Sequence, residues 1–96
     1  MKNLFDIKDK VIVITGGCGI LGKNIASYLA EQGAKIVILD RVEEAGRELE
    51  AELNRKSEAL FLVTDVLNKE VLEENKKAIL ERFGTIDVLL NAAGGN

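Results

Sequence analysis

Apolar runs alternate with amphipathic segments along the whole chain. Four runs, at residues 11–15, 34–39, 59–63 and 86–90, consist mainly of β-branched and aliphatic side chains without polar alternation. The first run begins with four consecutive β-branched residues, which is typical of a strand that is covered on both faces, as in a parallel sheet. The segments between them repeat apolar residues every three or four positions, which indicates helices. The pattern therefore predicts a β-α-β-α-β-α-β chain.

Three helices are predicted between these strands. The first covers residues 20–32 and ends at Gly33, and the second occupies the charged segment 43–56. The third covers residues 68–83, with Asn68 as its N-cap and Gly84 as its stop. The side chains expected to face inward are Leu21, Ile25, Ala26, Leu29 and Ala30 in the first helix, Val42, Ala45, Leu49 and Leu53 in the second, and Leu72, Ala78, Ile79 and Phe83 in the third.

The alternation of strands and helices defines the fold class. Parallel strands joined by right-handed crossovers predict an α/β fold with a Rossmann-like parallel sheet and the strand order 3-2-1-4. No linker, internal repeat or low-complexity segment interrupts the 96 residues. We therefore assign residues 1–96 to the N-terminal part of a single Rossmann-like domain.

Composition narrows the function classes. The chain has 13 basic and 16 acidic residues, a formal net charge of −3 and no basic block, which argues against a nucleic-acid partner. Its apolar runs are far shorter than the roughly 20 residues that span a bilayer, and the first ten residues lack an apolar signal-peptide core. The single cysteine and the lack of histidine exclude an internal disulfide and predict no metal site. A cytoplasmic protein without membrane association is expected.

A glycine-rich segment, Thr-Gly-Gly-Cys-Gly-Ile-Leu-Gly at residues 15–22, lies between the first strand and the first helix. Glycines at 16, 19 and 22 permit a tight turn and a close approach of the backbone to a ligand. The unpaired N–H groups and the dipole of the following helix favour a pyrophosphate there. We interpret the segment as a dinucleotide-binding loop. The alternative is a tight structural turn, because such glycine patterns also occur by chance.

An acidic residue, Asp40, ends the second strand about 20 residues past the loop, where a carboxylate can accept hydrogen bonds from both hydroxyls of an adenosine ribose. This position favours NAD over NADP, because a 2′-phosphate beside Asp40 would be repelled. Arg41, the next residue, could partly compensate that repulsion. The alternative role of Asp40 is the N-cap of the second helix, and both roles could coexist.

The third and fourth strands also end in residues suited to a nucleotide. Asp65 could accept a hydrogen bond from the adenine amino group, or it could serve only as a turn or cap before the third helix. The small residues Ala92, Ala93 and Gly94 would let the backbone approach the ribose and nicotinamide side of the cofactor, or they could form a tight exit turn. Because all four strand ends meet at one crevice, the constellation is more specific than the glycine motif alone.

The single cysteine, Cys18, lies within the glycine loop. A thiol beside the start of a helix can have a lowered pKa and be easily oxidised. The alternative, which we favour, is that Cys18 is a small residue at a position with little room.

Together these residues resemble the short-chain dehydrogenase/reductase family. The loop at 15–22, Asp40, Asp65-Val66 and Asn91-Ala92-Ala93-Gly94 occur in the order and approximate spacing of that family. The resemblance implies that the loop holds the pyrophosphate, that Asp65 and Val66 meet the adenine, and that Asn91 supports the ribose and the central strand. The residues expected to bind the cofactor are Gly16, Gly17, Cys18, Gly19, Ile20, Leu21, Gly22, Asp40, Arg41, Asp65, Val66, Asn91, Ala92, Ala93 and Gly94.

The glycine spacing departs from the commonest pattern of short family members, which place glycine at positions 16, 20 and 22. The spacing 16, 19 and 22 resembles the nucleotide-sugar epimerases and dehydratases of the extended branch. The lead-in at residues 5–10 and the exit at residues 91–96 instead resemble short bacterial dehydrogenases of sugar acids such as mannonate or fructuronate. We favour the short branch, which implies hydride transfer between nicotinamide and a secondary alcohol or ketone of a sugar acid or polyol.

The family's catalytic serine, tyrosine and lysine follow the fourth strand, so the resemblance places none of them within these 96 residues. Tyr28 is no substitute, since Gln32 rather than a lysine follows it four positions later. The chain is therefore expected to be the cofactor-binding part of a longer, homo-oligomeric enzyme with a small-molecule substrate, and to be inactive alone. The alternatives are a non-catalytic dinucleotide-binding module and the N-terminal part of an extended-branch epimerase or dehydratase.

Overall fold

A computed structural model of the chain describes residues 6–92. Four parallel strands form one sheet: β1 (Val11–Thr15), β2 (Lys35–Asp40), β3 (Ala59–Val63) and β4 (Val88–Asn91). Their order in the sheet is β3-β2-β1-β4, which confirms the predicted Rossmann-like order. The central strand β1 pairs with β2 on one side and with β4 on the other, so that Val13 lies beside both Val37 and Leu89.

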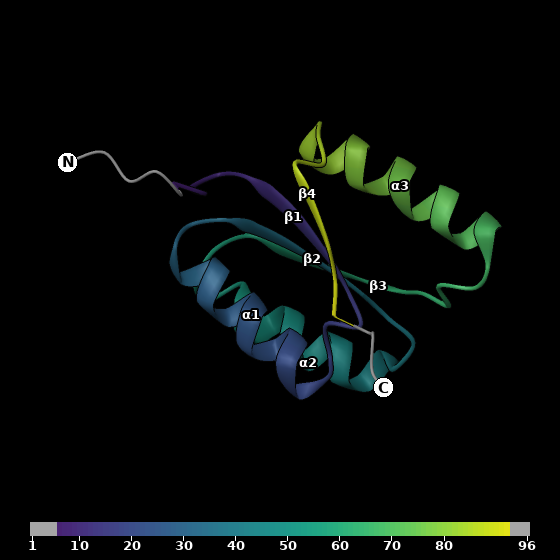
Figure 1. Ribbon diagram of the computed structural model, residues 1–96, viewed down its shortest axis with the longest axis horizontal. Helices are drawn as coiled ribbons and strands as arrows, with labels where there is room; N and C mark the ends of the chain where they lie inside the picture. The colour runs from purple at the N-terminus through teal and green to yellow at the C-terminus, as the bar shows by residue number, and fades with distance from the viewer. Residues whose placement is uncertain (1–5, 93–96) are drawn as a thin grey trace.

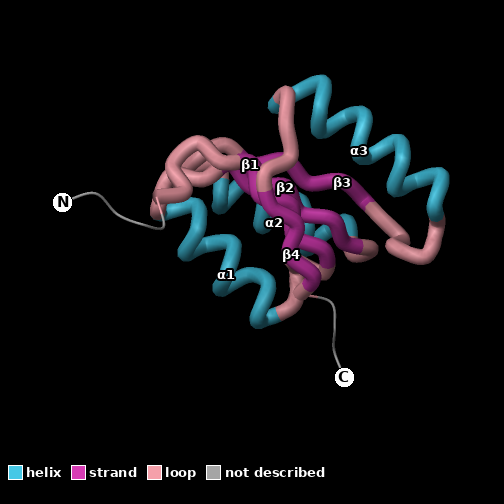
Figure 2. Tube along the Cα trace, turned by 45° about the horizontal axis from the view of Figure 1, so that its top comes forward, coloured by secondary structure: helices cyan, strands magenta, loops and turns pink. Residues whose placement is uncertain are grey.

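Helices cover both faces of this sheet. Helices α1 (Ile20–Glu31) and α2 (Glu43–Leu53) lie on one face, and α3 (Lys69–Phe83) lies on the other (Figure 1). The rotated view shows the same separation of α3 from the other two helices (Figure 2). Within residues 6–92, no helix has the length and apolar character that crossing a membrane requires.

The predicted helix signals at the ends of α3 are confirmed. The side chain of Asn68 accepts hydrogen bonds from the N–H groups of Glu70 and Val71, which makes it the N-cap. Gly84 ends the helix with a φ of 81°, and Gly33 has a φ of 92° just after α1. Both glycines therefore adopt the left-handed conformation that commonly follows a helix.

The hydrophobic core has two parts, one on each face of the sheet, because successive strand side chains point to opposite sides. Toward α1 and α2, the buried cluster includes Ile14, Ile38 and Phe61. Toward α3, a smaller cluster includes Val13 and Ile79. The apolar runs of β1 and β2 are thus explained by burial on both faces, as the sequence predicted. The edge strand β4 is mostly exposed, with Val88 38% and Leu89 66% exposed.

Three of the side chains predicted to face inward are exposed instead. Leu21 is 63% exposed, because the residues of α1 that pack inward are the small ones at 22, 26 and 30. Val42 is 55% exposed, because it is the extended N-cap residue of α2 and lies before the helical face begins. Ala78 is exposed because Asn75 and Ile79 form the narrow buried stripe of α3.

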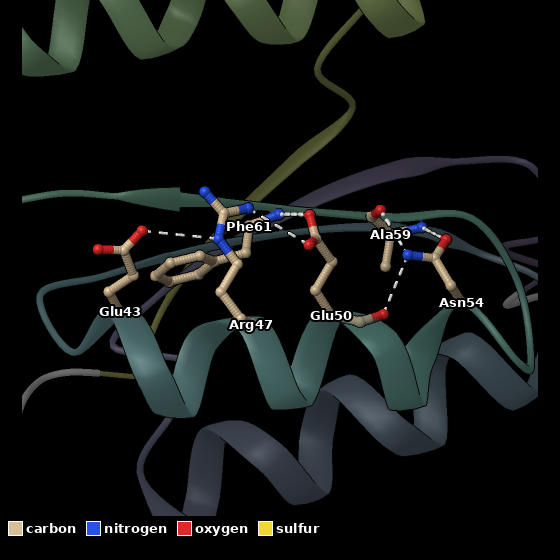
Figure 3. Close-up of polar contacts among 6 residues, drawn as sticks. All are labelled: Glu43, Arg47, Glu50, Asn54, Ala59 and Phe61. Atoms are coloured by element: carbon tan, nitrogen blue, oxygen red, sulfur yellow. Dashed lines mark hydrogen bonds and ion pairs between the residues drawn. The ribbon is translucent and has the colours of Figure 1, made fainter.

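Side chains from α2 close the outer edge of strand β3 (Figure 3). The Phe61 N–H donates to the Glu50 carboxylate at 2.7 Å. Asn54 accepts from the Ala59 N–H at 2.9 Å and donates to the Ala59 carbonyl at 3.1 Å. Three of the backbone groups that an additional strand would use, the Ala59 N–H and carbonyl and the Phe61 N–H, are therefore already paired. At the opposite side of the described sheet, no strand pairs with the outer edge of β4, where Leu89 is 66% exposed.

Candidate cofactor site

The carboxyl ends of all four strands meet at one edge of the sheet, as the parallel order requires. Thr15 at the end of β1 lies beside Leu39 of β2 and beside Asn91 of β4, and Asp40 lies beside Val63 of β3. The glycine loop follows β1 at this edge (Figure 1). In open α/β sheets, ligands bind outside this edge where the strand order reverses.

Three glycines of the loop are required by its own geometry. Gly16 has a φ of 70°, which is strained for a residue with a side chain. A Cβ on Gly17 would lie 2.7 Å from Ile38 Cδ1, and a Cβ on Gly22 would lie 2.6 Å from the Gly17 Cα. These contacts bring the loop and the first turn of α1 close to each other and to β2.

Gly19 differs from these three glycines. It is the exposed N-cap residue of α1 with ordinary extended dihedral angles, φ −74° and ψ 168°. A Cβ there would lie 3.7 Å from its nearest neighbour, the carbonyl oxygen of Gly16, which is an ordinary contact distance. The packing of the described residues therefore does not require glycine at this position.

The N-terminus of α1 is open to an anion. Its N-cap makes no side-chain hydrogen bond, and its first turn contains no acidic residue. By contrast, α2 has Glu43 and Glu44 in its first turn, and α3 is capped by Asn68. The first N–H groups of α1 have no acceptor within the helix and lie at the positive end of its dipole. Ile20 and Leu21, which the sequence placed in the cofactor set, are exposed at this end.

Asp40 connects the glycine loop to the turn after β2. One carboxylate oxygen, Oδ2, accepts a hydrogen bond from the Cys18 N–H at 3.0 Å, and Oδ1 accepts one from the Val42 N–H at 3.1 Å. The N-cap of α2 is Val42, so the alternative prediction that Asp40 is the N-cap is wrong. Arg41 is exposed on the same turn.

The Cys18 thiol is not activated. Burial, and then the negative charge of Asp40 and a side-chain hydrogen bond to it, raise the pKa of Cys18 to about 11, against a smaller lowering by Lys23. The interpretation of Cys18 as a thiol with a lowered pKa is therefore wrong. The physical reason is that burial disfavours the charged thiolate first of all, and the nearby carboxylate of Asp40 disfavours it further.

Alkylation should report this raised pKa. A rise from 9.0 to about 11 leaves about 100-fold less thiolate at neutral pH, so Cys18 should react correspondingly slowly with iodoacetamide. The rate should increase about tenfold per pH unit between pH 7 and pH 10, since the reactive thiolate is the form favoured by high pH. The urea-unfolded chain is the control, and equal rates in folded and unfolded chain at pH 7.5 would contradict the assignment.

Thr15 joins the ends of β1 and β4. Its hydroxyl donates to Asn91 Oδ1 at 2.9 Å, and its carbonyl accepts from the Ala92 N–H at 2.9 Å. Thr15 was not among the predicted site residues, although a hydroxyl at the last position of a buried strand is a signal for such a role. Ala93 and Gly94 lie outside the described residues.

Asp65 forms a turn before α3, which is the second of the two roles that the sequence suggested for it. Its Oδ1 accepts from the Leu67 N–H at 3.0 Å, and its carbonyl accepts from the N–H of Asn68, the helix cap. Val66, the next residue, is 40% exposed. The described structure thus accounts for Asp65 as a turn residue, and contact of Asp65 and Val66 with an adenine stays a prediction.

A cavity of about 500 Å³ adjoins this strand-end region on the α3 face. Neither the glycine loop nor Asp40 lines it; it meets the candidate site at Thr15, Val66 and Asn91. Asn75 in its wall is only 7% exposed and donates to the Thr64 hydroxyl at 2.7 Å. Its other lining residues are Val13, Leu39, Leu72, Glu73, Lys76, Ile79, Ile86 and Leu89.

Comparison with known proteins gives consistent matches. The sequence model of the short chain dehydrogenase family matches residues 10–96. The uncharacterized oxidoreductase UxuB of Bacillus subtilis is 40% identical over 92 residues, which are 95% of this chain and 33% of UxuB. The chain thus spans about a third of the length of this relative.

Two solved structures extend the comparison to bound cofactors. A protein assigned as a D-mannonate oxidoreductase from Haemophilus influenza, with bound NAD, superposes with a TM-score of 0.88 at 38% identity, over 95% of this chain and 33% of that one. L-sorbose reductase from Gluconobacter frateurii, complexed with NADPH and L-sorbose, gives a TM-score of 0.87 at 32% identity, over 95% and 36%.

Proposed function

The chain belongs to the short-chain dehydrogenase family, and from that premise we propose that it is the NAD-binding part of an oxidoreductase. The observation that carries this proposal is the uncapped N-terminus of α1, which lies next to a glycine loop held by Asp40. Such a helix start binds phosphate groups through its free N–H groups and its dipole. The dinucleotide, when bound, supplies a nicotinamide that accepts or donates a hydride.

Each strand end has a role in this proposal. The first-turn N–H groups of α1 hold the pyrophosphate, and the bare backbone at Gly19 leaves room for it. Asp40 accepts hydrogen bonds from the adenosine ribose through the lone pairs that its two protein N–H partners leave free. Asp65 and Val66 meet the adenine. Asn91, held by the Thr15 hydroxyl, supports the nicotinamide side together with residues 92–94.

We propose NAD rather than NADP as the cofactor. The carboxylate of Asp40 would repel a 2′-phosphate on the adenosine ribose. The exposed Arg41 is the one feature of this turn that favours NADP, since its side chain could reach such a phosphate. Relatives with NAD and with NADPH are both known, so a direct comparison of the two cofactors is the appropriate measurement.

The substrate class follows from the relatives rather than from residues 6–92. Two matched structures are described as acting on D-mannonate and as binding L-sorbose. We therefore propose a secondary alcohol or ketone of a sugar acid or polyol as substrate of the whole, homo-oligomeric enzyme. We expect the 96-residue chain alone to bind cofactor without turnover.

The free thiol of Cys18 fits a reducing compartment, and we propose the cytoplasm as the location of the protein.

Calorimetry with NADH, NADPH and a Gly19→Val variant tests the proposal. The 96-residue chain should bind NADH more tightly than NADPH. Valine at position 19 should weaken NADH binding at least about tenfold, because its side chain would cover the first-turn N–H groups while the surrounding packing leaves it room. The melting temperature should change little, since the loss of a glycine N-cap costs a few tenths of a kcal/mol up to about 1 kcal/mol.

Ala51→Val is the control for the Gly19 experiment, because Ala51 is exposed on α2 away from the loop. It adds the same kind of bulk and should leave NADH binding unchanged. Failure of the unmodified chain to bind either cofactor would exclude the proposed function. Equal NADH affinity of the Gly19→Val chain would exclude the proposed position of the pyrophosphate.

A further inference from the structure

The carboxylate of Asp40 is hydrogen-bonded to the glycine loop. Its Oδ2 accepts from the N–H of Cys18, 22 residues earlier in the chain, at 3.0 Å. Its Oδ1 accepts from the N–H of Val42, two residues later, at 3.1 Å. Both bonds have a charged acceptor, and such bonds are about twice as strong as neutral ones.

Apart from the bond to Asp40, backbone hydrogen bonds hold the glycine loop at Gly16 and Gly19, and neither of these holds Cys18. The Gly16 N–H donates to the Leu39 carbonyl at 2.8 Å, which fixes the start of the loop to β2. The Gly19 N–H donates to the Gly16 carbonyl at 3.3 Å, which is a long bond within the loop itself. Between these two points, the Cys18 N–H bond to Asp40 is the polar contact that joins the loop to another element.

We propose that Asp40 is a positioning residue for the glycine loop: by holding the Cys18 N–H, its carboxylate sets the path of the loop into α1. This inference rests on the proposed function and deepens it, because Asp40 then contributes to pyrophosphate binding as well as to ribose recognition. The raised pKa of the Cys18 thiol agrees with close contact between Cys18 and the carboxylate.

The proposal predicts an effect on a ligand that Asp40 cannot contact through hydroxyls. The diphosphate of 2′,3′-dideoxyadenosine keeps the adenine and both phosphates but lacks both ribose hydroxyls. If Asp40 acted only on those hydroxyls, removal of its negative charge would leave the binding of this anion unchanged or tighten it. If Asp40 positions the loop, its removal weakens binding, so the two roles predict opposite signs.

The first measurement is the affinity for this dideoxy diphosphate by calorimetry. Asp40→Ala should weaken binding at least about fivefold, the equivalent of one hydrogen bond. Asp40→Asn, which keeps the shape and one acceptor oxygen, should fall between it and the unmodified chain and serves if the alanine variant folds poorly. Asp6→Ala is the matched control, because Asp6 accepts from the Lys8 N–H in an equivalent two-residue turn before β1, whereas the loop follows the other end of that strand.

The second measurement tests the hydrogen bond of the Cys18 N–H directly and needs no ligand. Amide hydrogen exchange at Cys18, followed by NMR, should be at least about tenfold faster in Asp40→Ala than in the unmodified chain or in Asp6→Ala. Unchanged exchange at Cys18, or unchanged or tighter binding of the dideoxy diphosphate, would overturn the positioning role. If the unmodified chain binds neither NADH nor ADP, the proposed function fails, and faster Cys18 exchange would still identify Asp40 as the group that holds the loop.

Discussion

Replacing Gly22 with alanine is expected to remove NADH binding and to destabilise the fold. A Cβ at this position would lie 2.6 Å from the Gly17 Cα and 2.7 Å from the Gly16 carbonyl oxygen. Both neighbours are backbone atoms, so no side-chain rotation can relieve the clash, and α1 must move away from the loop. Overpacking of this kind costs about 1–3 kcal/mol. A displaced α1 no longer directs its N–H groups at the pyrophosphate, and NADH affinity should fall about 100-fold or more.

Calorimetry with NADH and urea unfolding measure the two effects of the Gly22 substitution. Gly19→Ala is the matched control for stability, because it makes the same chemical change three residues earlier, where the nearest atom to the new Cβ is 3.7 Å away. The control should unfold within about 1 kcal/mol of the unmodified chain. A Gly22→Ala chain that unfolds and binds NADH like the unmodified chain would show that the loop and helix can separate without loss of function.

The sequence predicted that the glycines share one role in a ligand-binding loop, but it did not show that each glycine is present for a different reason. Spacing identified Gly16, Gly19 and Gly22 as one set. In the structure, Gly22 is needed for packing against Gly17, whereas Gly19 has room for a side chain. The spacing of residues in the sequence indicates where a loop lies. The distance between Gly22 and Gly17 depends instead on how α1 packs against that loop, which the spacing does not show. Because packing does not explain glycine at position 19, the proposed contact with the pyrophosphate is the reason that we offer for it.

The order of the strands was predictable because it depends on burial and crossover handedness, which are regular along the chain. The phase of each helix was less predictable. Leu21 and Val42 failed as core residues because loop and cap geometry, rather than hydrophobic spacing, decides where a helical face begins. Cys18 failed as a reactive thiol candidate because its pKa is raised by burial first and then by Asp40, 22 residues away, neither of which the adjacent helix start reveals.

The second large effect, a loss of stability, is expected from Gly46→Ala. Gly46 lies on the buried face of α2. A Cβ there would lie 2.1 Å from Phe61 Cε1 and 2.2 Å from Phe61 Cζ. Phe61 is fully buried, and the guanidinium of Arg47 lies 5.3 Å from its ring centroid. The ring cannot move without disturbing the core, so α2 must lift from β3 and lose the Glu50 bond to the Phe61 N–H (Figure 3). The free energy of unfolding should fall by about 2–4 kcal/mol.

The sign of the Gly46 effect makes it a sharp test. In an exposed helix, glycine to alanine stabilises by about 1 kcal/mol through helix propensity, so a loss must come from the contact with Phe61. Urea unfolding of Gly46→Ala, Phe61→Leu and the double variant separates the two terms. The smaller leucine leaves room for the new methyl group, so the double variant should be more stable than the sum of the single losses predicts, by about 1 kcal/mol or more. Additive losses would mean that the helix moves for another reason and that the close approach of α2 to β3 does not depend on glycine at position 46.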